Sequence, residues 1–316
     1  MSYSELLKKI ESKTAHVAVM GQGYVGLPLA MEVTHSGYHC LGVDVSARTV
    51  DAINRGVSHI LDVTSDELNK ALATGRYRAS ANYADIANAD VVSICVPTPL
   101  RKTKDPDVSY IQASVAAMRP HLKRDGVLII LESTTYPGTT DELVADALAG
   151  EGLVLDENLF VAFSPERVDP GNPTYGLKNT PKVVGGVTPR ATDLIAAFYR
   201  QVVDHVHTVR SAREAEMVKL LENTFRAVNI ALVNEMLLMC DRMGIDMWDV
   251  IQAASTKPFG FMPFYPGPGI GGHCIPLDPT YLSWKAKSYG FYNRFIELAT
   301  DINGNMPCFV VQKPRG

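Results

Sequence analysis

The feature that most constrains the fold is a glycine-rich turn between an apolar run and a helical segment. The sequence G-Q-G-Y-V-G at 21–26 follows the strand-like run H-V-A-V-M at 16–20 and precedes a helical segment that extends to His35. A second strand-like run at 39–44 ends in Asp44. A strand, a G-x-G-x-x-G turn, a helix and a second strand with a terminal acid are typical of a βαβ unit that binds a dinucleotide.

Each residue type in this unit has a physical reason. Gly21 permits the tight turn, Gly23 lets the backbone approach a diphosphate, and Gly26 lets helix and strand pack closely. Asp44 would accept from the adenosine ribose and disfavour the 2′-phosphate of NADP, so NAD is the predicted cofactor. Arg48, one helical turn further on, either stacks on adenine or is a solvated arginine at a helix start. The residues expected to contact NAD here are Gly21, Gly23, Tyr24, Val25, Gly26, Asp44 and Arg48.

The rest of the first two thirds of the chain repeats the alternation of strand and helix. Continuous apolar strands separated by helices indicate a parallel sheet covered on both faces. The expected strands are 91–96, 126–133, 159–164, 181–187 and 205–209, and the expected helices are 109–121, 138–150 and 189–203. The fold class is therefore α/β, a Rossmann-like doubly wound sheet.

Beyond this layer the sequence becomes helical. Residues 213–243 contain no proline or glycine, which predicts a helix about 45 Å long that stops at Gly244. Further helices are expected at 246–255, 279–289 and 291–303, with a loop rich in glycine and proline before 279.

This pattern divides the chain into a Rossmann-like domain at 1–210, a helical central domain at 211–303 and the start of a linker at 304–316. The long helix carries more apolar surface than one domain face needs, so we expect a homodimer with these helices at its centre. The apolar stripe consists of Met217, Leu220, Leu221, Phe225, Val228 and Leu232.

The bulk properties exclude several classes of protein. The 316 residues carry a formal net charge of −4, which gives no electrostatic case for binding nucleic acid or an anionic membrane. No apolar run reaches the roughly 18 residues of a membrane span, and the N-terminus lacks the apolar core of a signal peptide, so a cytoplasmic location is expected. The five cysteines form no C-x-x-C pair and no zinc-like cluster, so no metal is expected. Cys40 and Cys95 lie in strand-like runs and are expected to be buried thiols.

The glycine-rich segment 266–278 contains the cysteine of greatest interest. Its glycines leave room for a ligand beside Cys274, and Asp278 lies four residues further on. The alternative is a connector that holds an incidental cysteine. His273 is expected to be a scaffold residue because adjacent side chains usually point apart. A cysteine hydrolase built on Cys, His and Asp would leave the dinucleotide loop without a purpose.

Together these motifs resemble the UDP-glucose/GDP-mannose dehydrogenase family, from about residue 15 to 311. The longer glycine–cysteine segment and the S-P-E-R motif are most similar to bacterial UDP-N-acetylglucosamine 6-dehydrogenases. The motifs are V-A-V-M-G-Q-G-Y-V-G-L-P-L-A, I-C-V-P-T-P (94–99), E-S-T-T-Y-P-G-T-T (132–140), F-S-P-E-R-V-D-P-G-N (163–172), the segment 214–235 and G-P-G-I-G-G-H-C-I-P-L-D-P (267–279).

The resemblance implies a four-electron oxidation of the C6 hydroxymethyl of a UDP-sugar, with two NAD and one water consumed. The matching nucleophile is Cys274, which would capture the aldehyde and carry the thioester that water hydrolyses. Lys219 and Asn223, four apart on one helix face, would stabilise a developing oxyanion.

Further roles follow from the same resemblance. Thr134 would hold a water or the cofactor near the reacting carbon, Glu166 would handle protons or position the hydrolytic water, and Asp278 would order the lysine and water. Some relatives carry a second glutamate where this chain has Pro170, beside Asp169, so a mechanism that needs two glutamates is in doubt. The loop residues expected around the cofactor are Val96, Pro97 and Thr98, and those expected around the substrate are Glu166, Arg167, Lys219, Asn223, Phe264, Tyr265 and Gly271.

The family normally continues with a further α/β domain that helps to hold the uridine diphosphate, whereas this sequence stops at M-P-C-F-V-V-Q-K-P-R-G. That ending motivates one alternative to the enzyme, an NAD-binding dimeric scaffold without turnover. A second alternative is a simple hydroxyacid dehydrogenase with the same two-part plan, against which Cys274 argues. UDP-GlcNAc is the favoured substrate and UDP-glucose the next, with UDP-GalNAc also open.

Overall fold

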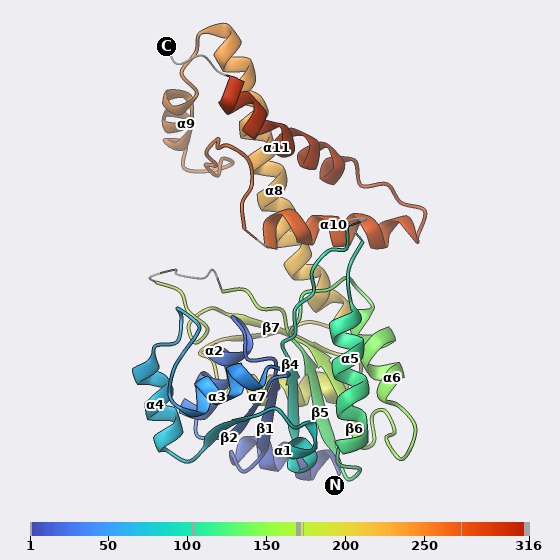
Figure 1. Ribbon diagram of the computed structural model, residues 1–316. Coiled ribbons are helices and arrows are strands. Elements are labelled where there is room, and N and C mark those ends of the chain that lie inside the picture. Colours follow the sequence, from blue (N-terminus) through green and yellow to red (C-terminus); the bar gives the residue numbers. More distant parts are fainter. Residues whose placement is uncertain (1, 103–104, 169–171, 173, 273, 313–316) are drawn as a thin grey trace. The chain divides into compact units, whose positions relative to one another are not determined.

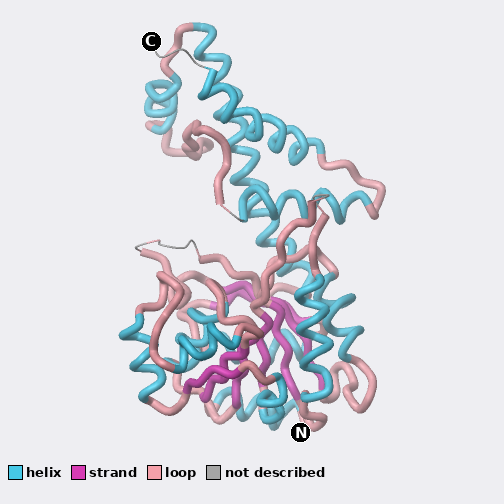
Figure 2. Tube along the Cα trace, viewed as in Figure 1, coloured by secondary structure: helices cyan, strands magenta, loops and turns pink. Residues whose placement is uncertain are grey.

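The computed structural model describes residues 2–102, 105–168, 172, 174–272 and 274–312, and it divides into two compact units. The first unit comprises residues 1–99 and 107–219, and the second comprises 100–106 and 220–316. All the strands lie in the first unit, whereas the second is built of helices and loops (Figure 2).

The first unit is an eight-stranded sheet in the order β3-β2-β1-β4-β5-β6-β7-β8. The order of the first six strands is that of a dinucleotide-binding fold. The strands are β1 (His16–Met20), β2 (His39–Val43), β3 (Tyr77–Ser80), β4 (Val91–Ile94), β5 (Val127–Leu131), β6 (Leu159–Phe163), β7 (Lys182–Gly186) and β8 (Val206–Thr208). The Rossmann-like, doubly wound fold class is thus confirmed.

Both faces of the sheet are buried, which explains the continuous apolar strands. Along β1, Val17 and Val19 enter one hydrophobic cluster, and Ala18 and Met20 enter the other. The helices are α1 (Tyr3–Glu11), α2 (Gly26–His35), α3 (Ala47–Asn54), α4 (Ser65–Ala73), α5 (Ser109–Met118), α6 (Asp146–Leu148) and α7 (Pro189–Tyr199) (Figure 1). Short 3₁₀ segments lie at η1 (Tyr83–Asn88) and η2 (Arg119–His121), and a π-helical segment lies at η3 (Thr140–Ala145).

One pairing in the sheet differs from the parallel arrangement expected throughout. Strands β6 and β7 pair in antiparallel fashion, with Ala162 opposite Gly186. A parallel connection needs a crossover, usually a helix, and the described residues between these two strands contain none. The antiparallel turn places Lys182, the first residue of β7, at the carboxyl edge of the parallel strands.

A buried carboxylate, that of Asp90, lies at the amino-terminal edge of the parallel strands. The Asp90 carboxylate accepts from the Lys9 ammonium at 3.0 Å and from the His16 N–H at 2.9 Å, and it also accepts from Lys123. Burial alone would raise the pKa of Asp90, but the hydrogen bonds from Lys123, His16 and Lys9 hold it below its ordinary value. Asp90 therefore ties α1 to the start of β1.

The helical unit contains most of α8 (Ala212–Met243), together with α9 (Met247–Ser255), α10 (Cys274–Lys287) and α11 (Arg294–Gln312). The predicted long helix is present, and the predicted stop at Gly244 has the positive φ of 68° expected of a C-terminal glycine. A small core of Val233, Cys240, Met247 and Ile251 joins α8 to α9.

Several predicted helix limits were wrong. Helix α10 begins at Cys274 rather than at Pro279, because Pro276 falls in the first turn, where N–H groups have no intrahelical acceptor. Helix α11 continues beyond Asn303, through Gly304 and Pro307. Helix 138–150 is replaced by the π-helical η3 and the single turn α6, and the sequence analysis missed α4 and β3.

Candidate functional site

The dinucleotide loop lies at the carboxyl ends of β1 and β2. Gly21 has a φ of 87°, and a Cβ there would lie 2.6 Å from the Cys95 carbonyl oxygen. A Cβ on Gly26 would lie 1.8 Å from the Gly21 carbonyl oxygen, whereas a Cβ on Gly23 would meet nothing within 4 Å. The first and third glycines are therefore required by packing, and the second leaves an open backbone position that suits a diphosphate.

Asp44 follows β2 and is held by the backbone. Its Oδ2 accepts from the Gln22 N–H and its Oδ1 from the Ser46 N–H, both at 2.8 Å. These contacts fix the carboxylate beside the glycine loop, where the sequence analysis expects a ribose. Arg48 is exposed on α3 and Tyr24 is 65% exposed, so both side chains can reach a ligand. The residues of this loop thus fit NAD.

Sequence reasoning missed the buried Gln22 inside the same loop. Its side chain is fully buried, donates to the Val19 carbonyl at 2.8 Å, and accepts from the Tyr77 hydroxyl at 2.8 Å. The variable position of the G-x-G-x-x-G pattern therefore carries a structural residue that locks the loop onto β1 and β3. No sequence pattern signals this role.

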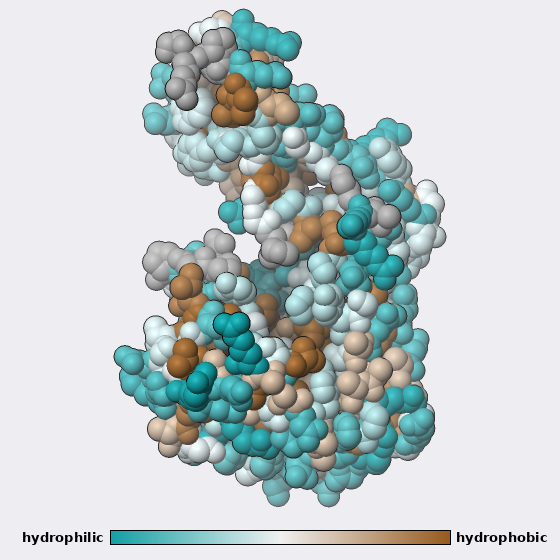
Figure 3. All heavy atoms as spheres, in the orientation of Figure 1, coloured by the Kyte–Doolittle hydropathy of each residue, from teal (hydrophilic) through white to brown (hydrophobic). Residues whose placement is uncertain are grey.

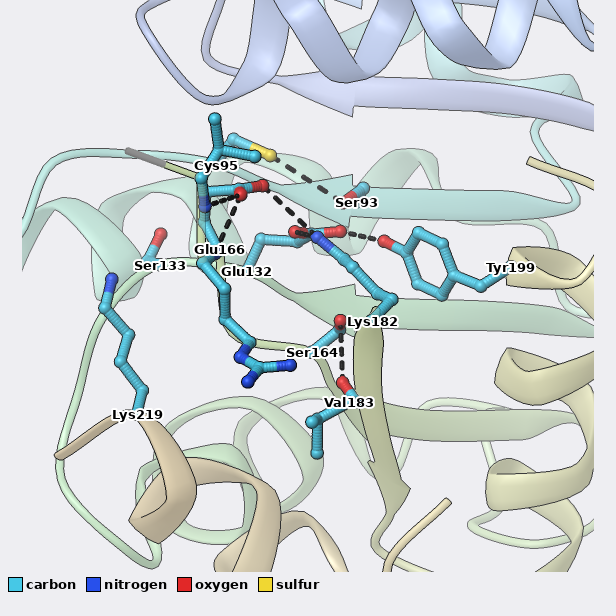
Figure 4. A network of polar contacts seen from close by, with 12 residues as sticks. Ser93, Cys95, Glu132, Ser133, Ser164, Glu166, Lys182, Val183, Tyr199 and Lys219 are labelled. Atoms are coloured by element: carbon cyan, nitrogen blue, oxygen red, sulfur yellow. Dashed lines mark hydrogen bonds and ion pairs between the residues drawn. The ribbon is translucent and has the colours of Figure 1, made fainter. Parts of the chain in front are cut away.

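A second group of polar side chains lies further along the carboxyl edge. Glu132 follows β5, Glu166 follows β6, and Lys182 begins β7 (Figure 4). The Lys182 Nζ lies 2.7 Å from Glu132 Oε2 and 3.3 Å from Glu166 Oε2. The structure therefore places Glu166 in a buried ion cluster, whose other members, Glu132 and Lys182, were not predicted as site residues.

Lys219 and Thr134 meet within the first unit. The Lys219 ammonium donates to Thr134 Oγ1 at 2.5 Å, and the lysine is only 8% exposed. Both residues were predicted from the sequence as site residues, but their contact was not. An ammonium on a threonine hydroxyl can share a proton with it or orient it toward a bound oxygen.

Glu216, one helical turn before Lys219, explains how this contact is held. Its carboxylate accepts from the Gly138 N–H at 2.6 Å, the Thr140 N–H at 2.9 Å and the Thr140 hydroxyl at 2.7 Å. Burial raises the pKa of Glu216 to about 7, although these hydrogen bonds oppose the shift. Glu216 therefore ties α8 to the 134–140 loop.

The helical unit carries its own polar pair. The Asn223 side-chain amide donates to Asp278 Oδ2 at 2.5 Å, and Asp278 is almost fully buried on α10. This contact joins Asp278 to the amide four residues beyond Lys219, and the expected role of Asp278 in ordering the lysine and water stays a prediction. The backbone of Cys274 opens α10, whereas its side chain, together with His273, Asp169 and Pro170, lies outside the described residues.

The glycine-rich loop before Cys274 is fixed by two buried asparagines. The Asn234 side chain accepts from the Gly267 N–H at 3.0 Å and donates to Asn303 at 2.9 Å. The same loop and α11 line a cavity of about 350 Å³, with Gly271 among the lining residues. Of the other residues expected around substrate, Tyr265 is exposed, and Phe264 packs edge-to-face on Phe225 with ring centroids 5.8 Å apart.

The remaining expected site residues are placed as follows. Val96, Pro97 and Thr98 form the loop after β4, and the Val96 carbonyl accepts from the Ser133 hydroxyl at 2.7 Å. Arg167 donates to the Pro181 carbonyl at 2.6 Å. Cys40 and Cys95 are buried, as predicted, and burial raises the pKa of both thiols. None of the helices in the described part of the chain is long and apolar enough to span a membrane.

Comparison with known proteins agrees with this geometry. Residues 15–203 match the NAD binding domain, and residues 213–305 the central domain, of the UDP-glucose/GDP-mannose dehydrogenase family. A UDP-N-acetyl-D-mannosamine dehydrogenase of Pyrococcus horikoshii is 38% identical over 93% of this chain and 69% of its own length. A UDP-N-acetyl-D-glucosamine 6-dehydrogenase of Pseudomonas aeruginosa is 37% identical over 95% of this chain and 70% of its own. The solved structure of a UDP-D-ManNAc dehydrogenase from P. horikoshii superposes with a TM-score of 0.87 at 37% identity, over 94% of this chain and 70% of that one.

Proposed function

Because the chain belongs to the UDP-glucose/GDP-mannose dehydrogenase family, we propose that it oxidises the C6 hydroxymethyl of a UDP-sugar to the carboxylate. The cofactor is NAD, which accepts a hydride in each of the two oxidations. The observation that carries the proposal is the 2.5 Å contact between the Lys219 ammonium and the Thr134 hydroxyl. This partly buried pair combines a cation, which stabilises an alkoxide, with a hydroxyl that can transfer a proton.

In the proposed reaction, Glu166, Lys219 and Cys274 each have a separate role. In the first oxidation, the Glu166 carboxylate takes the proton of the C6 hydroxyl as hydride leaves carbon, and the Lys219 ammonium stabilises the developing alkoxide. The Cys274 thiolate then adds to the aldehyde, and loss of a second hydride from that adduct gives a thioester. Water, with its proton taken by Glu166, displaces the thiol, so one hydroxymethyl, one water and two NAD yield one carboxylate, two NADH and three protons.

The position of Cys274 supports its assignment as nucleophile. It is the first residue of α10, and the N-terminus of a helix favours an anion such as a thiolate. The Asn223 amide, held by Asp278 at 2.5 Å, supplies a donor of the kind that stabilises an oxyanion.

The substrate assignment rests on the relatives. The Pyrococcus and Pseudomonas proteins are named for UDP-N-acetylhexosamines, which supports an N-acetylated sugar. We propose UDP-GlcNAc as the preferred substrate and UDP-glucose as the next. Because the Pyrococcus protein is named for UDP-N-acetyl-D-mannosamine, UDP-ManNAc is added to the sugars to be tested.

The test is NADH formation at 340 nm with each of UDP-GlcNAc, UDP-ManNAc, UDP-GalNAc and UDP-glucose. We expect two NADH per sugar with the preferred substrate. We expect Cys274→Ala to abolish this yield, whereas Cys308→Ala, at an exposed cysteine, leaves it unchanged. One NADH per molecule with a hydroxyacid would instead indicate a simple dehydrogenase. NAD binding without turnover on any sugar would indicate a scaffold.

We also propose a homodimer through α8. Apolar side chains come to the surface of the helical unit (Figure 3), and Leu221, Phe225 and Leu232 of the predicted stripe are each about half exposed or more. Leu220, by contrast, is fully buried within the chain. Sedimentation as a monomer at micromolar concentration would contradict the dimer.

A further inference from the structure

The ion cluster at the carboxyl edge contains more charge than packing requires. Lys182 is 4% exposed and Glu132 is fully buried, whereas Glu166 keeps 13% of its side chain exposed. One lysine and one glutamate would already form a compensated buried pair. The second carboxylate adds a desolvation cost, and buried charges are a poor means of gaining stability. The partly exposed Glu166 is therefore the member of the cluster that calls for another explanation.

Each oxygen of the two carboxylates has a defined environment. Glu166 Oε1 accepts from the backbone N–H groups of Arg167 and Val168 at 2.7 and 2.8 Å. Among the described residues, Glu166 Oε2 has one hydrogen-bond contact, the long 3.3 Å one from the Lys182 ammonium, so this oxygen can accept another hydrogen bond. Glu132, in contrast, takes the short contact with Lys182, and the Tyr199 hydroxyl donates to its other oxygen (Figure 4).

This asymmetry also separates the protonation of the two carboxyls. Burial raises the pKa of Glu132 to about 7 despite the opposing charge of Lys182. Burial would also raise the pKa of Glu166, but Lys182, the two backbone N–H groups and Lys219 hold it below its ordinary value. The Cys95 thiol and the Tyr199 hydroxyl also lie beside the cluster. One ammonium therefore faces one carboxyl that binds a proton readily and one that stays charged, a division typical of acid–base sites.

We propose that Lys182 is the positioning residue that keeps the Glu166 carboxylate ionised, with Glu166 Oε2 free to accept a proton, and that Glu132 acts only by holding the Lys182 ammonium in place. Glu132 fixes the Lys182 ammonium, Tyr199 fixes Glu132, and the ammonium sets the charge of Glu166 without contacting substrate. The use of Glu166 as a proton acceptor rests on the function proposed above, whereas the control of its charge by Lys182 does not.

The test measures the titration of Glu166 in the chain without cofactor or sugar. Protein labelled with ¹³C at the glutamate side-chain carboxyl is titrated by NMR, and Glu166→Gln identifies the resonance. We expect Lys182→Met to move the midpoint of Glu166 up by about one pH unit or more, because the opposite charge is lost. Glu132→Gln leaves Lys182 in place and removes a competing carboxyl, so the midpoint stays the same or falls. Lys178→Met, at an exposed lysine outside the cluster, is the matched control and leaves the midpoint unchanged.

An unchanged Glu166 midpoint in Lys182→Met that still binds NAD would overturn the proposal, as would a rise in Glu132→Gln. If Lys182→Met does not fold, the double variant Lys182→Met/Glu132→Gln replaces the charged pair by a neutral one and must show the same upward shift. The readout is independent of turnover. If Glu166 titrates as expected while no UDP-sugar is oxidised, the proposed function fails and the positioning role stands. If a sugar is oxidised, the acid limb of the kcat profile should follow the Glu166 midpoint while KM is unchanged.

Discussion

Two alanine substitutions in the glycine loop should have opposite consequences, although they lie three residues apart. In Gly26→Ala the new Cβ would lie 1.8 Å from the Gly21 carbonyl oxygen and 3.2 Å from the Cys95 Cβ. In Gly23→Ala the new Cβ would meet no protein atom within 4 Å. Only the first substitution should disturb the fold, and only the second should act mainly on the cofactor.

The magnitudes follow from these distances. A Cβ against a backbone oxygen forces the backbone to move, and overpacking of this kind costs about 2 kcal/mol. For a unit of this size the cost corresponds to a fall of about 6 °C in Tm. Gly23→Ala should leave Tm within about 1 °C of the unchanged protein. It blocks one backbone donor to a charged diphosphate, worth about 2 kcal/mol, so the affinity for NAD should fall about thirtyfold.

Differential scanning calorimetry gives Tm, and titration of NADH fluorescence gives the affinity. Both measurements need only the folded chain and no sugar substrate. If Gly23→Ala bound NADH as tightly as the unchanged protein, the diphosphate would not lie at this loop. If Gly26→Ala kept its Tm, the close approach of α2 to the turn would not be a packing constraint.

Three further substitutions test the buried polar groups. Burial raises the pKa of Glu216 to about 7, above its unfolded value, so the stabilisation from this group is present below about pH 4.5 and is lost as pH rises to about 7. In urea titrations, Glu216→Gln should therefore reduce the loss of unfolding free energy between pH 5 and 8 by about 2 kcal/mol. An unaltered dependence of the unfolding free energy on pH would refute this. Asp90 has a lowered pKa, so its stabilisation is present above the unfolded pKa and is lost as pH falls. Asp90→Ala should lower the unfolding free energy by about 3 kcal/mol at pH 7 and by less near pH 3. Equal costs at both pH values would count against the ion pairs of Asp90 with Lys9 and Lys123. Asn303→Ala removes the partner of Asn234 and should lower the urea midpoint by the equivalent of about 2 kcal/mol, whereas Asn305→Ala, at an exposed position of the same helix, should not.

Much of the fold could be predicted from local patterns. The glycine turn, the continuous apolar strands and the long segment free of glycine and proline each reflect the preference of a few neighbouring residues. The errors arose where local pattern and tertiary context disagree. The proline-rich start of α10 reads as a loop, yet a proline in the first turn removes no intrahelical hydrogen bond. The antiparallel pairing of β7 depends on which edge of the sheet the chain re-enters, which no single segment encodes.

The candidate site was predictable in its members but not in its connections. The motifs selected Lys219, Thr134 and Glu166, because a resemblance acts on residue type and register. They gave no sign that the Lys219 ammonium contacts the Thr134 hydroxyl, or that Glu216 holds them together. Such contacts join residues about 80 positions apart, so they exist only once the chain has folded.

By itself, the sequence determined the dinucleotide fold, the cofactor and the family, because these depend on spacing along one βαβ unit and on residue types in fixed order. The tertiary structure decided how the charges are arranged. The antiparallel return of β7 brings Lys182 between Glu132 and Glu166, and burial there gives two chemically identical carboxyls different affinities for a proton. A side chain's protonation depends on its solvent exposure and on its neighbours in space, and both are fixed only by the folded chain.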